Sequence, residues 1–371
     1  MKFLDCIQIS PPVSLVKGKI YSFIEMANVS TVFREPDYID VKAFSSGTKF
    51  EDGDTVIARI EPCLQNGKRF FVKGIGKGFG STEFLVFRPK TIDVDNKYLY
   101  YFMKTEYIQQ LMVSSMTGAT GRQRVNNDIF SDLEISLPDL PTQRRIASIL
   151  SAYDDLIENN RRQIKLLEEA AQRLYREWFV ELRFPGHESV KVVDGVPEGW
   201  MKVCLKDICE TKTGKKDANF GCDDGAYPFF TCAQAPIKAP SYSFDCSAVI
   251  LAGNGDFNVK LYRGKFEAYQ RTYVLSPANT EYLFLLYNAV RRNMNVLTKG
   301  ASGSTIKFLT KGMIDSIDLL IPSSQLLTTY NQNSEALQKS IEVLRRKIAL
   351  AVEARDRLLP RLMNHEMEVM L

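Results

Sequence analysis

The fold is decided by the segment from Ile146 to Phe179, which reads IASILSAYDDLIENNRRQIKLLEEAAQRLYREWF and contains neither glycine nor proline. Apolar residues recur along it in steps of four and three, which is the heptad spacing of a coiled-coil seam. A polar residue at one seam position commonly fixes the register of paired helices at some cost in stability. The segment therefore predicts one long helix that pairs with another. Its seam positions are Ile146, Leu150, Tyr153, Ile157, Asn160, Ile164, Leu167, Ala171, Leu174 and Trp178.

A second segment repeats this pattern 184 residues further along the chain. Adding this offset to the residue number of each seam position in the first helix predicts the seam positions of the second helix without any adjustable parameter. Each helix of about 38 residues would be about 57 Å long, which is too long for one small globule to cover. We therefore expect the two helices to bury each other's seams as an antiparallel coiled coil. The second seam consists of Tyr330, Ser334, Leu337, Ile341, Leu344, Ile348, Ala351, Arg355 and Leu358.

Signals at the ends of both segments agree with these helices. Asp139 and Pro141 mark the start of the first helix and Ser323-Ser324 the start of the second, since such residues favour N-terminal positions. The first helix is predicted to end near Phe179, before a loop rich in turn residues. Pro360 is predicted to end or kink the second helix.

Similar stretches also recur outside the helices, at the same offset or with small shifts, so the whole chain forms two copies of one unit. Short β-branched and aromatic runs between turn signals predict that the front of each copy is a small, strand-rich globule. The matched stretches are Asp54–Ala58 with Ser247–Leu251, Glu83–Pro89 with Arg271–Pro277, Tyr98-Leu99 with Tyr282-Leu283, Gly118–Gly121 with Gly300–Gly303, and Leu137-Pro138 with Ile321-Pro322.

These patterns predict an α+β chain with a pseudo-twofold internal repeat. Two similar strand-rich α/β globular domains are separated by two long helices that form an antiparallel coiled coil, which would place the globules at opposite ends. The predicted parts are residues 1–138, the first globular domain; 139–180, the first spacer helix; 181–200, a linker; 201–322, the second globular domain; and 323–371, the second spacer helix with the tail.

Composition and charge limit the possible functions. The chain has 371 residues, of which 45% are hydrophobic and 25% charged, with a formal net charge of +4. Residues 1–140 carry 17 basic and 17 acidic side chains and residues 180–322 carry 17 and 15, so any nucleic-acid surface must be a local patch. The sequence has no apolar run of the roughly 20 residues that a membrane span needs and no secretory signal. We expect a cytoplasmic protein without membrane contact.

Signatures of catalysis and of metal binding are missing from the sequence. The seven cysteines include no Cys-x-x-Cys pair and there are only two histidines, which argues against a zinc site or a disulfide framework. No P-loop is present, and neither Asn-Pro-Pro-Tyr nor Asp-Pro-Pro-Tyr, the signatures of amino-methyltransferases, occurs. We therefore predict that the chain is not an enzyme and itself binds neither a metal nor a cofactor.

Two similar globules held apart by a rigid spacer suit the task of reading two separated segments of a DNA duplex, because half-sites one helical turn apart lie about 34 to 36 Å from each other. Five motifs support this hypothesis. They are LPDLPTQRRI at 137–146, LYREWF at 174–179, RFPGH at 183–187, VPEGW at 196–200 and LLPRLM at 358–363. In this order they closely resemble the DNA specificity subunit of type I restriction-modification systems (HsdS).

The resemblance implies two target recognition domains, each reading one half of a bipartite, asymmetric site in double-stranded DNA, with the helices fixing the gap. It also implies two methyltransferase subunits that bind S-adenosylmethionine and restriction subunits that hydrolyse ATP. This chain would be the non-catalytic reader that docks the methyltransferase subunits. The alternative is a coiled-coil protein interaction scaffold without sequence-specific DNA binding.

Candidate DNA-binding residues follow from the comparison of the two copies. Features that both copies share suit the scaffold or phosphates, whereas features that differ suit bases. For every one of these residues an ordinary surface role stays open. The candidates for phosphate contacts are Gly121, Arg122, Gln123, Arg124, Lys212, Lys215, Lys216, Gly303, Ser304 and Lys307. The candidates for base contacts, chosen for polar groups on unmatched loops, are Gln65, Asn66, Lys68, Arg69, Gln234, Asn254, Asn258 and Lys260.

Overall fold

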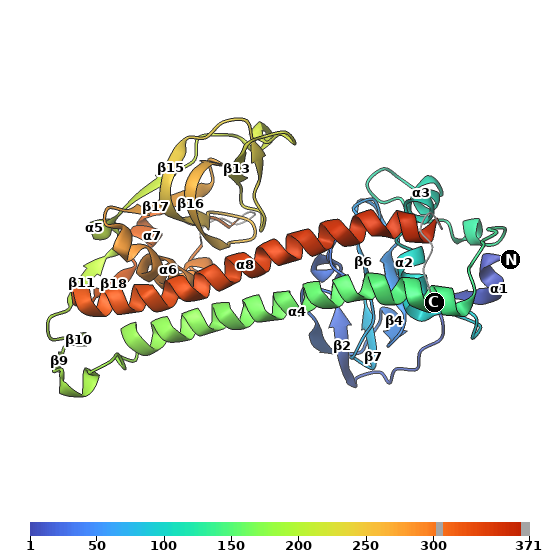
Figure 1. Ribbon diagram of the computed structural model, residues 1–371, viewed down its shortest axis with the longest axis horizontal. Coiled ribbons are helices and arrows are strands. Elements are labelled where there is room, and N and C mark those ends of the chain that lie inside the picture. Colours follow the sequence, from blue (N-terminus) through green and yellow to red (C-terminus); the bar gives the residue numbers. More distant parts are fainter. Residues whose placement is uncertain (302–306, 365–371) are drawn as a thin grey trace. The chain divides into compact units, whose positions relative to one another are not determined.

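The computed structural model describes residues 1–301 and 307–364, and the chain divides into two compact units (Figure 1). Unit 1 comprises Met1–Gln163 with Val343–Leu371, and unit 2 comprises Ile164–Glu342. Both predicted long helices are present as α4 (Leu140–Phe179) and α8 (Ser324–Met363). Each of them contributes one part to unit 1 and the other part to unit 2.

Unit 1 contains two four-stranded sheets, with strand orders β1-β8-β5-β6 and β3-β2-β7-β4. All pairings are antiparallel except that of β2 with β7. The elements are α1 (Phe3–Cys6), β1 (Ile7–Ile9), β2 (Ile20–Ile24), β3 (Asp40–Ala43), β4 (Thr48–Glu51), β5 (Thr55–Ala58), β6 (Arg69–Phe71), β7 (Lys77–Gly80), β8 (Phe84–Pro89), α2 (Asn96–Phe102) and α3 (Glu106–Ser114), with short 3₁₀ turns at Met26–Asn28 and Asn127–Phe130.

The core of unit 1 lies on both faces of the first sheet. Strand β5 is buried at all four positions, as expected for a central strand covered on both sides. Alternate side chains point to opposite faces of a strand, so Ile57 joins the cluster of Leu85 and Phe87. Val56 joins the cluster of Val86 on the other face.

Unit 2 contains one six-stranded sheet of order β12-β17-β15-β16-β13-β14 and two small two-stranded sheets, β10-β9 and β11-β18. The elements are β9 (Val192–Val193), β10 (Val196–Pro197), β11 (Met201–Cys204), α5 (Leu205–Ile208), β12 (Cys209–Thr213), β13 (Tyr227–Phe230), β14 (Ile237–Ala239), β15 (Phe244–Ala252), β16 (Val259–Ala268), β17 (Thr272–Pro277), α6 (Leu283–Lys299), α7 (Lys311–Asp315) and β18 (Asp318–Ile321), with 3₁₀ turns at His187–Ser189, Ala218–Phe220 and Thr280–Tyr282.

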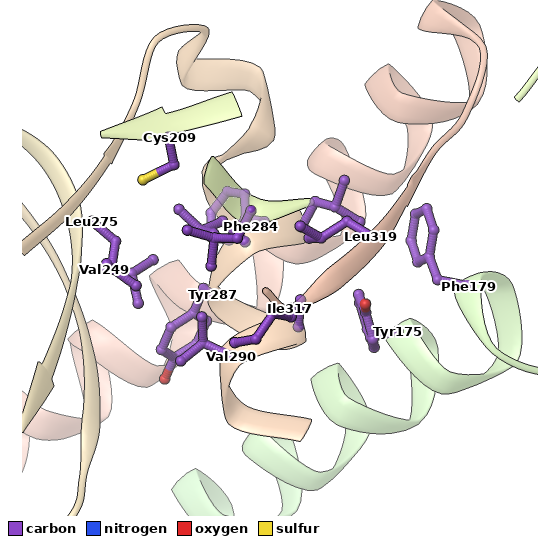
Figure 2. Packing of buried hydrophobic residues seen from close by; sticks show 14 of the residues in the cluster. Tyr175, Phe179, Cys209, Val249, Leu275, Phe284, Tyr287, Val290, Ile317 and Leu319 are labelled. Atoms are coloured by element: carbon purple, nitrogen blue, oxygen red, sulfur yellow. The ribbon is translucent and has the colours of Figure 1, made fainter. Parts of the chain in front are cut away.

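The main core of unit 2 forms where α6 packs between the sheet and the end of α4 (Figure 2). Val249 and Leu275 come from the sheet and Phe284 from α6. Tyr175 and Phe179 come from the last turns of α4. Aromatic residues at the end of the first long helix therefore pack that helix onto a globule.

Four strands are paired in the same order in both units, β1-β8-β5-β6 and β12-β17-β15-β16, and this pairing corrects one predicted match. Glu83–Pro89 and Arg271–Pro277 contain β8 and β17. Ala58 pairs with Phe84, and the residue that matches Phe84, Thr272, pairs with Ala252. Strand Thr55–Ala58 therefore corresponds to 249–252. The predicted match of Asp54–Ala58 with Ser247–Leu251 is wrong by one residue, because a short apolar run lacks a marker that fixes its phase.

The long helices are antiparallel neighbours within each unit. In unit 1, Ile146 and Leu150 of α4 share a core cluster with Leu359 and Leu362 of α8. In unit 2, the rings of Phe179 and Tyr330 lie 4.8 Å apart. The start of α4 thus contacts the end of α8, and the end of α4 contacts the start of α8. The two helices are therefore antiparallel.

Most seam residues are buried, including the polar Asn160 at 3% exposure, and the rest are half-buried. The half-buried residues are Tyr153, Ile164, Leu167, Leu174, Leu337, Ile348 and Leu358.

Pro360 does not end α8, which continues to Met363. In the part of the chain that the structure describes, none of the helices is both long and apolar enough to cross a bilayer.

Candidate nucleic-acid interface

In unit 1 two of the predicted segments lie side by side. The loop between β5 and β6 spans residues 59–68, and it contacts the backbone that follows the glycine-rich loop at 118–121. The Val125 amide donates to the Arg59 carbonyl (2.9 Å), and the Glu61 amide donates to the Gln123 carbonyl (3.1 Å). The Gly121 amide donates to the Glu61 carboxylate. Gly121 has a φ of +83°, a conformation that favours glycine.

Unit 2 builds the same arrangement from corresponding segments. The loop between β15 and β16 spans residues 253–258, and it contacts the backbone at 307–309. The Leu309 amide donates to the Gly253 carbonyl (2.8 Å), and Asn254 forms a β-bridge with Phe308. In both units, therefore, a hairpin loop is hydrogen-bonded to a later segment. The β5–β6 loop of unit 1 bonds to the segment after α3, and the β15–β16 loop of unit 2 bonds to the segment after α6.

A third segment joins this cluster in each unit. In unit 2 it is the loop at 231–236, which is held by side chains of the β15–β16 hairpin. Asn258 Nδ2 donates to the Cys232 carbonyl (2.9 Å), and Lys260 Nζ donates to the Ala233 carbonyl (2.8 Å). In unit 1, Lys68 Nζ donates to the Met26 carbonyl (2.7 Å). In each unit, hydrogen bonds thus join three loops into one cluster, which we call the three-loop surface of that unit.

These contacts separate the predicted residues into two groups. Lys68, Asn258 and Lys260 hold neighbouring loops in place, and Asn254 accepts from Cys232 Sγ (2.8 Å). The side chains that remain exposed around these loops carry amides or positive charge, which are the groups that contact bases and phosphates. They are Gln65, Asn66, Arg122, Gln234 and Lys307.

The structure contradicts the prediction that Arg69 contacts DNA. Arg69 lies in β6 with only 6% of its surface exposed, and burial lowers the pKa of its guanidinium. Its Nη1 donates to the Met103 carbonyl (2.7 Å) and its Nη2 to Gln109 Oε1 (2.6 Å). These donors tie the sheet to the helices of unit 1, so the side chain is structural.

Two other predicted cations have partners within the protein. Arg124 forms a two-point ion pair with Glu83, with Nη2 at 2.6 Å from Oε1. Hydrogen bonding from Arg124 lowers the pKa of Glu83. Lys212 Nζ lies 2.8 Å from a carboxylate oxygen of Glu210. Both pairs are exposed, so a phosphate could replace the carboxylate at small cost.

The predicted loop with Lys215 and Lys216 does not contact the three loops directly but is linked to them through the turn between β16 and β17. Lys215 is exposed, and Lys216 lies over the ring of Phe220 with Nζ 4.3 Å from the centroid. The Lys216 carbonyl accepts from the Gln270 amide (3.0 Å), and the neighbouring Arg271 carbonyl accepts from the Gly253 amide (2.8 Å). The turn between β16 and β17 therefore connects the lysine loop to the β15–β16 loop.

Gly303 and Ser304 lie outside the described residues.

Sequence reasoning missed Phe308, a large apolar side chain that is 37% exposed beside Asn254. Its position directly after Lys307 was the available signal, because aromatic residues next to cations are typical of nucleic-acid surfaces. Within residues 1–301 and 307–364, no group of three or more His, Cys, Asp or Glu side chains could hold a metal ion.

A chain with an internal repeat, one three-loop surface in each unit and two long helices shared by both units is a duplicated-domain protein. The sequence family described as the type I restriction modification DNA specificity domain matches residues 16–169 and 197–343. Since these two stretches make up most of the chain, the protein belongs to this family. The two matched stretches are the two copies found in the sequence.

Known relatives agree with this assignment. The EcoDI type I restriction enzyme specificity subunit of Escherichia coli is 43% identical over 149 residues, which are 40% of this chain and 33% of that protein. The MjaIX specificity subunit of Methanocaldococcus jannaschii is 24% identical over 303 residues, 74% of this chain and 70% of that protein. This chain thus matches only about a third of the length of the E. coli relative.

A solved structure has the same fold over nearly the whole length. The crystal structure of the type I restriction-modification system S subunit from M. genitalium superimposes with a TM-score of 0.58 at 15% sequence identity. The superposition covers 98% of this chain and 95% of that one. The predicted class, two strand-rich domains with two long antiparallel helices, is confirmed.

Proposed function

We propose that this chain is the DNA-reading subunit of a type I restriction-modification complex. Each unit reads one half of a bipartite, asymmetric site through its three-loop surface. The observation that carries the proposal is that the two units share the backbone contacts of their loops but differ in the side chains that these loops expose. The same backbone contacts hold the loops in both units, while the exposed side chains at their tips differ.

The difference between the tips suits the reading of two different half-sites. In unit 1 the exposed tip of the β5–β6 loop carries Gln65 and Asn66. In unit 2 the exposed amide belongs to Gln234 on the neighbouring loop. Amide side chains can bond to adenine through two atoms at once in the major groove. Arg122 and Lys307 follow the glycine-rich loops and supply charge for phosphates.

The chain itself carries out no chemistry in this proposal. Two methyltransferase subunits that bind S-adenosylmethionine dock on its long helices, and restriction subunits that use ATP join the complex. Several relatives are named as specificity subunits of restriction enzymes, which supports such an assembly. Helices α4 and α8 each continue without interruption through both units, which supports a fixed spacing between the two half-sites.

The test is to map methylated adenines across the genome of a host that carries this chain with its methyltransferase. We expect one split motif, with two specific halves and an unspecified spacer. The matched variants are Gln65→Ala with Asn66→Ala in unit 1, and Gln234→Ala in unit 2. Each should relax the sequence in one half only, with a mismatch discrimination smaller by about 1–3 kcal/mol at the affected position.

The pair of variants serves as its own control, because each leaves the other half unchanged. A motif that is not split, or a variant that changes both halves equally, would contradict the proposal. Methylation without any sequence preference would instead favour the scaffold alternative.

A further inference from the structure

Two grooves occupy equivalent places in the two units. In unit 2 the groove lies between α4, from Lys165 to Arg176, and α6, from Arg291 to Asn295. In unit 1 it lies between residues 104–110 and the end of α8. Two polar contacts show the equivalence. Gln172 Nε2 donates to Asn288 Oδ1 at 2.7 Å in unit 2. At the offset of 184 residues, Lys104 Nζ donates to Asp356 Oδ1 at 3.0 Å in unit 1.

The chemistry of the two grooves has diverged. The groove of unit 1 includes the apolar or aromatic side chains Tyr107, Leu359 and Pro360. The groove of unit 2 is lined only by charged and amide side chains, and five of them are basic. Of these five positions, only that of Arg173 has a basic counterpart in unit 1. The five basic residues are Lys165, Arg173, Arg176, Arg291 and Arg292.

Most of this positive charge faces solvent. Lys165, Arg173 and Arg292 are exposed, and among the described residues none of the three has an ion pair. Arg291 is half-buried and lies 3.3 Å from Glu168. The lining also includes Glu168 and Glu169, so five basic against two acidic side chains leave an excess of three positive charges. Such an excess on two facing helices is repulsive, and a folded protein tolerates it most readily where an anionic ligand compensates it.

The lining of this groove suits a phosphate chain better than a protein segment. A docked peptide usually needs an apolar anchor that fills a pocket, and this groove offers no apolar side chain. Phosphates need only cations and amides, and their contacts with Lys and Arg dominate the affinity of DNA-binding proteins.

Positive charge continues beyond the groove along one face of α6. Arg292, Asn295 and Lys299 are exposed and follow one another at helical spacing along one face of α6. Helix α6 ends at Lys299. Arg292 and Lys299 therefore extend the positive charge of the groove along α6 toward the end of that helix.

We propose that the α4–α6 groove of unit 2 binds the phosphate backbone of duplex DNA just outside the half-site that unit 2 reads. The inference rests on the proposed function. It also makes the two units unequal, since the equivalent groove of unit 1 lacks the cations. Unit 2 would supply a larger share of the sequence-independent affinity.

The test measures the binding of the full-length chain to a duplex of random sequence and to its methylated motif, over a range of salt concentrations. The variant is Arg173→Gln with Arg292→Gln. We expect weaker binding to both duplexes, and a slope of log affinity against log salt that is smaller by about two, because each phosphate contact contributes about 0.9. Both side chains are exposed, so the thermal unfolding midpoint should stay unchanged.

Two single variants complete the design. Arg357→Gln is the matched control, because Arg357 is the counterpart of Arg173 in unit 1 and pairs with Glu353 at 2.7 Å. It should leave the slope unchanged. Glu169→Gln removes an acidic group from the groove of unit 2 and should tighten binding at fixed salt.

An unchanged slope in the double variant would overturn the inference. If that variant also lost the methyltransferase subunit in co-purification, the groove would dock a protein instead of DNA. Failure of the proposed function has a different signature. In that case the wild-type chain would bind the motif and the random duplex equally, while the comparison of slopes would still decide the role of the groove.

Discussion

Asp154 and Arg355 form an ion pair that is fully enclosed in unit 1, with each side chain 1% exposed and Nη1 2.6 Å from Oδ1. The hydroxyl of Tyr101 donates to the second oxygen of Asp154 at 2.5 Å. The pair joins α4 to α8. At the equivalent positions of unit 2 the chain has Gln338 and Ala171, so only unit 1 pairs its helices through buried charges. A buried charge is costly unless its partner is present, and this pair therefore favours one helix register in unit 1.

The first prediction follows from this contact. Arg355→Ala should lower the free energy of unfolding by about 3–5 kcal/mol, because it leaves the buried Asp154 carboxylate without a cation. Asp154→Ala should cost less, because Arg355 keeps its ion pair with Asp356 at 2.9 Å. The double variant Asp154→Ala with Arg355→Ala should lose less than the sum of the two single losses, since both charges are then gone. Urea unfolding of all four proteins closes the cycle. Strictly additive losses would show that the two side chains do not interact.

Residue-scale contacts of this kind could not be predicted from the sequence. The heptad pattern placed Arg355 at a seam position but gave no partner for it, because Asp154 lies one residue off the seam. Arg69 shows the reverse error. Its neighbours Gln65, Asn66 and Lys68 suggested an exposed basic loop, whereas it begins a buried strand. Local sequence identifies charged groups, but only tertiary packing determines whether they face solvent.

At the scale of elements, helix α6 is attached to the long helices of unit 2 through a buried amide. Asn288 is 1% exposed. Its Nδ2 donates to Tyr330 in α8 at 2.9 Å, and its Oδ1 accepts from Gln172 in α4. One side chain thus joins three helices. The bond to Tyr330 is buried within the surrounding apolar cluster, whereas Gln172 also lines the α4–α6 groove. Loss of the bond to Tyr330 would therefore leave a buried hydroxyl with one partner fewer, which lowers stability.

The second prediction concerns this attachment. Asn288→Ala should lower the free energy of unfolding of unit 2 by about 1–3 kcal/mol, because Gln172 loses its acceptor and the Tyr330 hydroxyl loses a donor. Asn295→Ala, on the exposed face of the same helix, is the matched control and should change stability by less than about 0.5 kcal/mol. Hydrogen exchange of α6 amides locates the effect. Equal protection in both variants would refute the role of Asn288.

Elements were predicted well where the pattern was long and less well where it was short. Helix α4 begins at Leu140 and ends at Phe179, as the signals at Asp139 and Phe179 indicated, because many heptads reinforce one phase. The matching of β5 to β15 slipped by one residue, because four apolar residues cannot fix a phase on their own. Of the two outcomes predicted for Pro360, an end or a kink of the helix, the end is wrong, since α8 continues to Met363.

At the scale of the whole molecule, the internal repeat was the most informative feature of the sequence. The offset of 184 residues predicted both long helices, and it also matches Lys104 with Asn288 and Asp356 with Gln172, pairs that make the same contact in each unit. Which loops come together could not be predicted, because the loop at 231–236 meets the β15–β16 hairpin through the pairing of β13 with β16 and through the side chains of Asn258 and Lys260, which are tertiary contacts. The identity of the bases read also depends on side-chain positions that the repeat does not specify.

The last prediction tests whether the shared helices set the spacing of the two half-sites. One added heptad, seven residues after Gln163 in α4 and seven after Glu342 in α8, keeps the seam phase of both helices. It lengthens each helix by about 10 Å at 1.5 Å per residue, or about three base pairs of duplex at 3.4 Å each. If the helices act as the spacer, mapping of methylated adenines should give the same two half-sites with about three more base pairs between them. Insertion in only one helix leaves the seams unequal in length and should abolish methylation. An unchanged gap in the doubly extended chain would mean that something other than α4 and α8 separates the two reading surfaces.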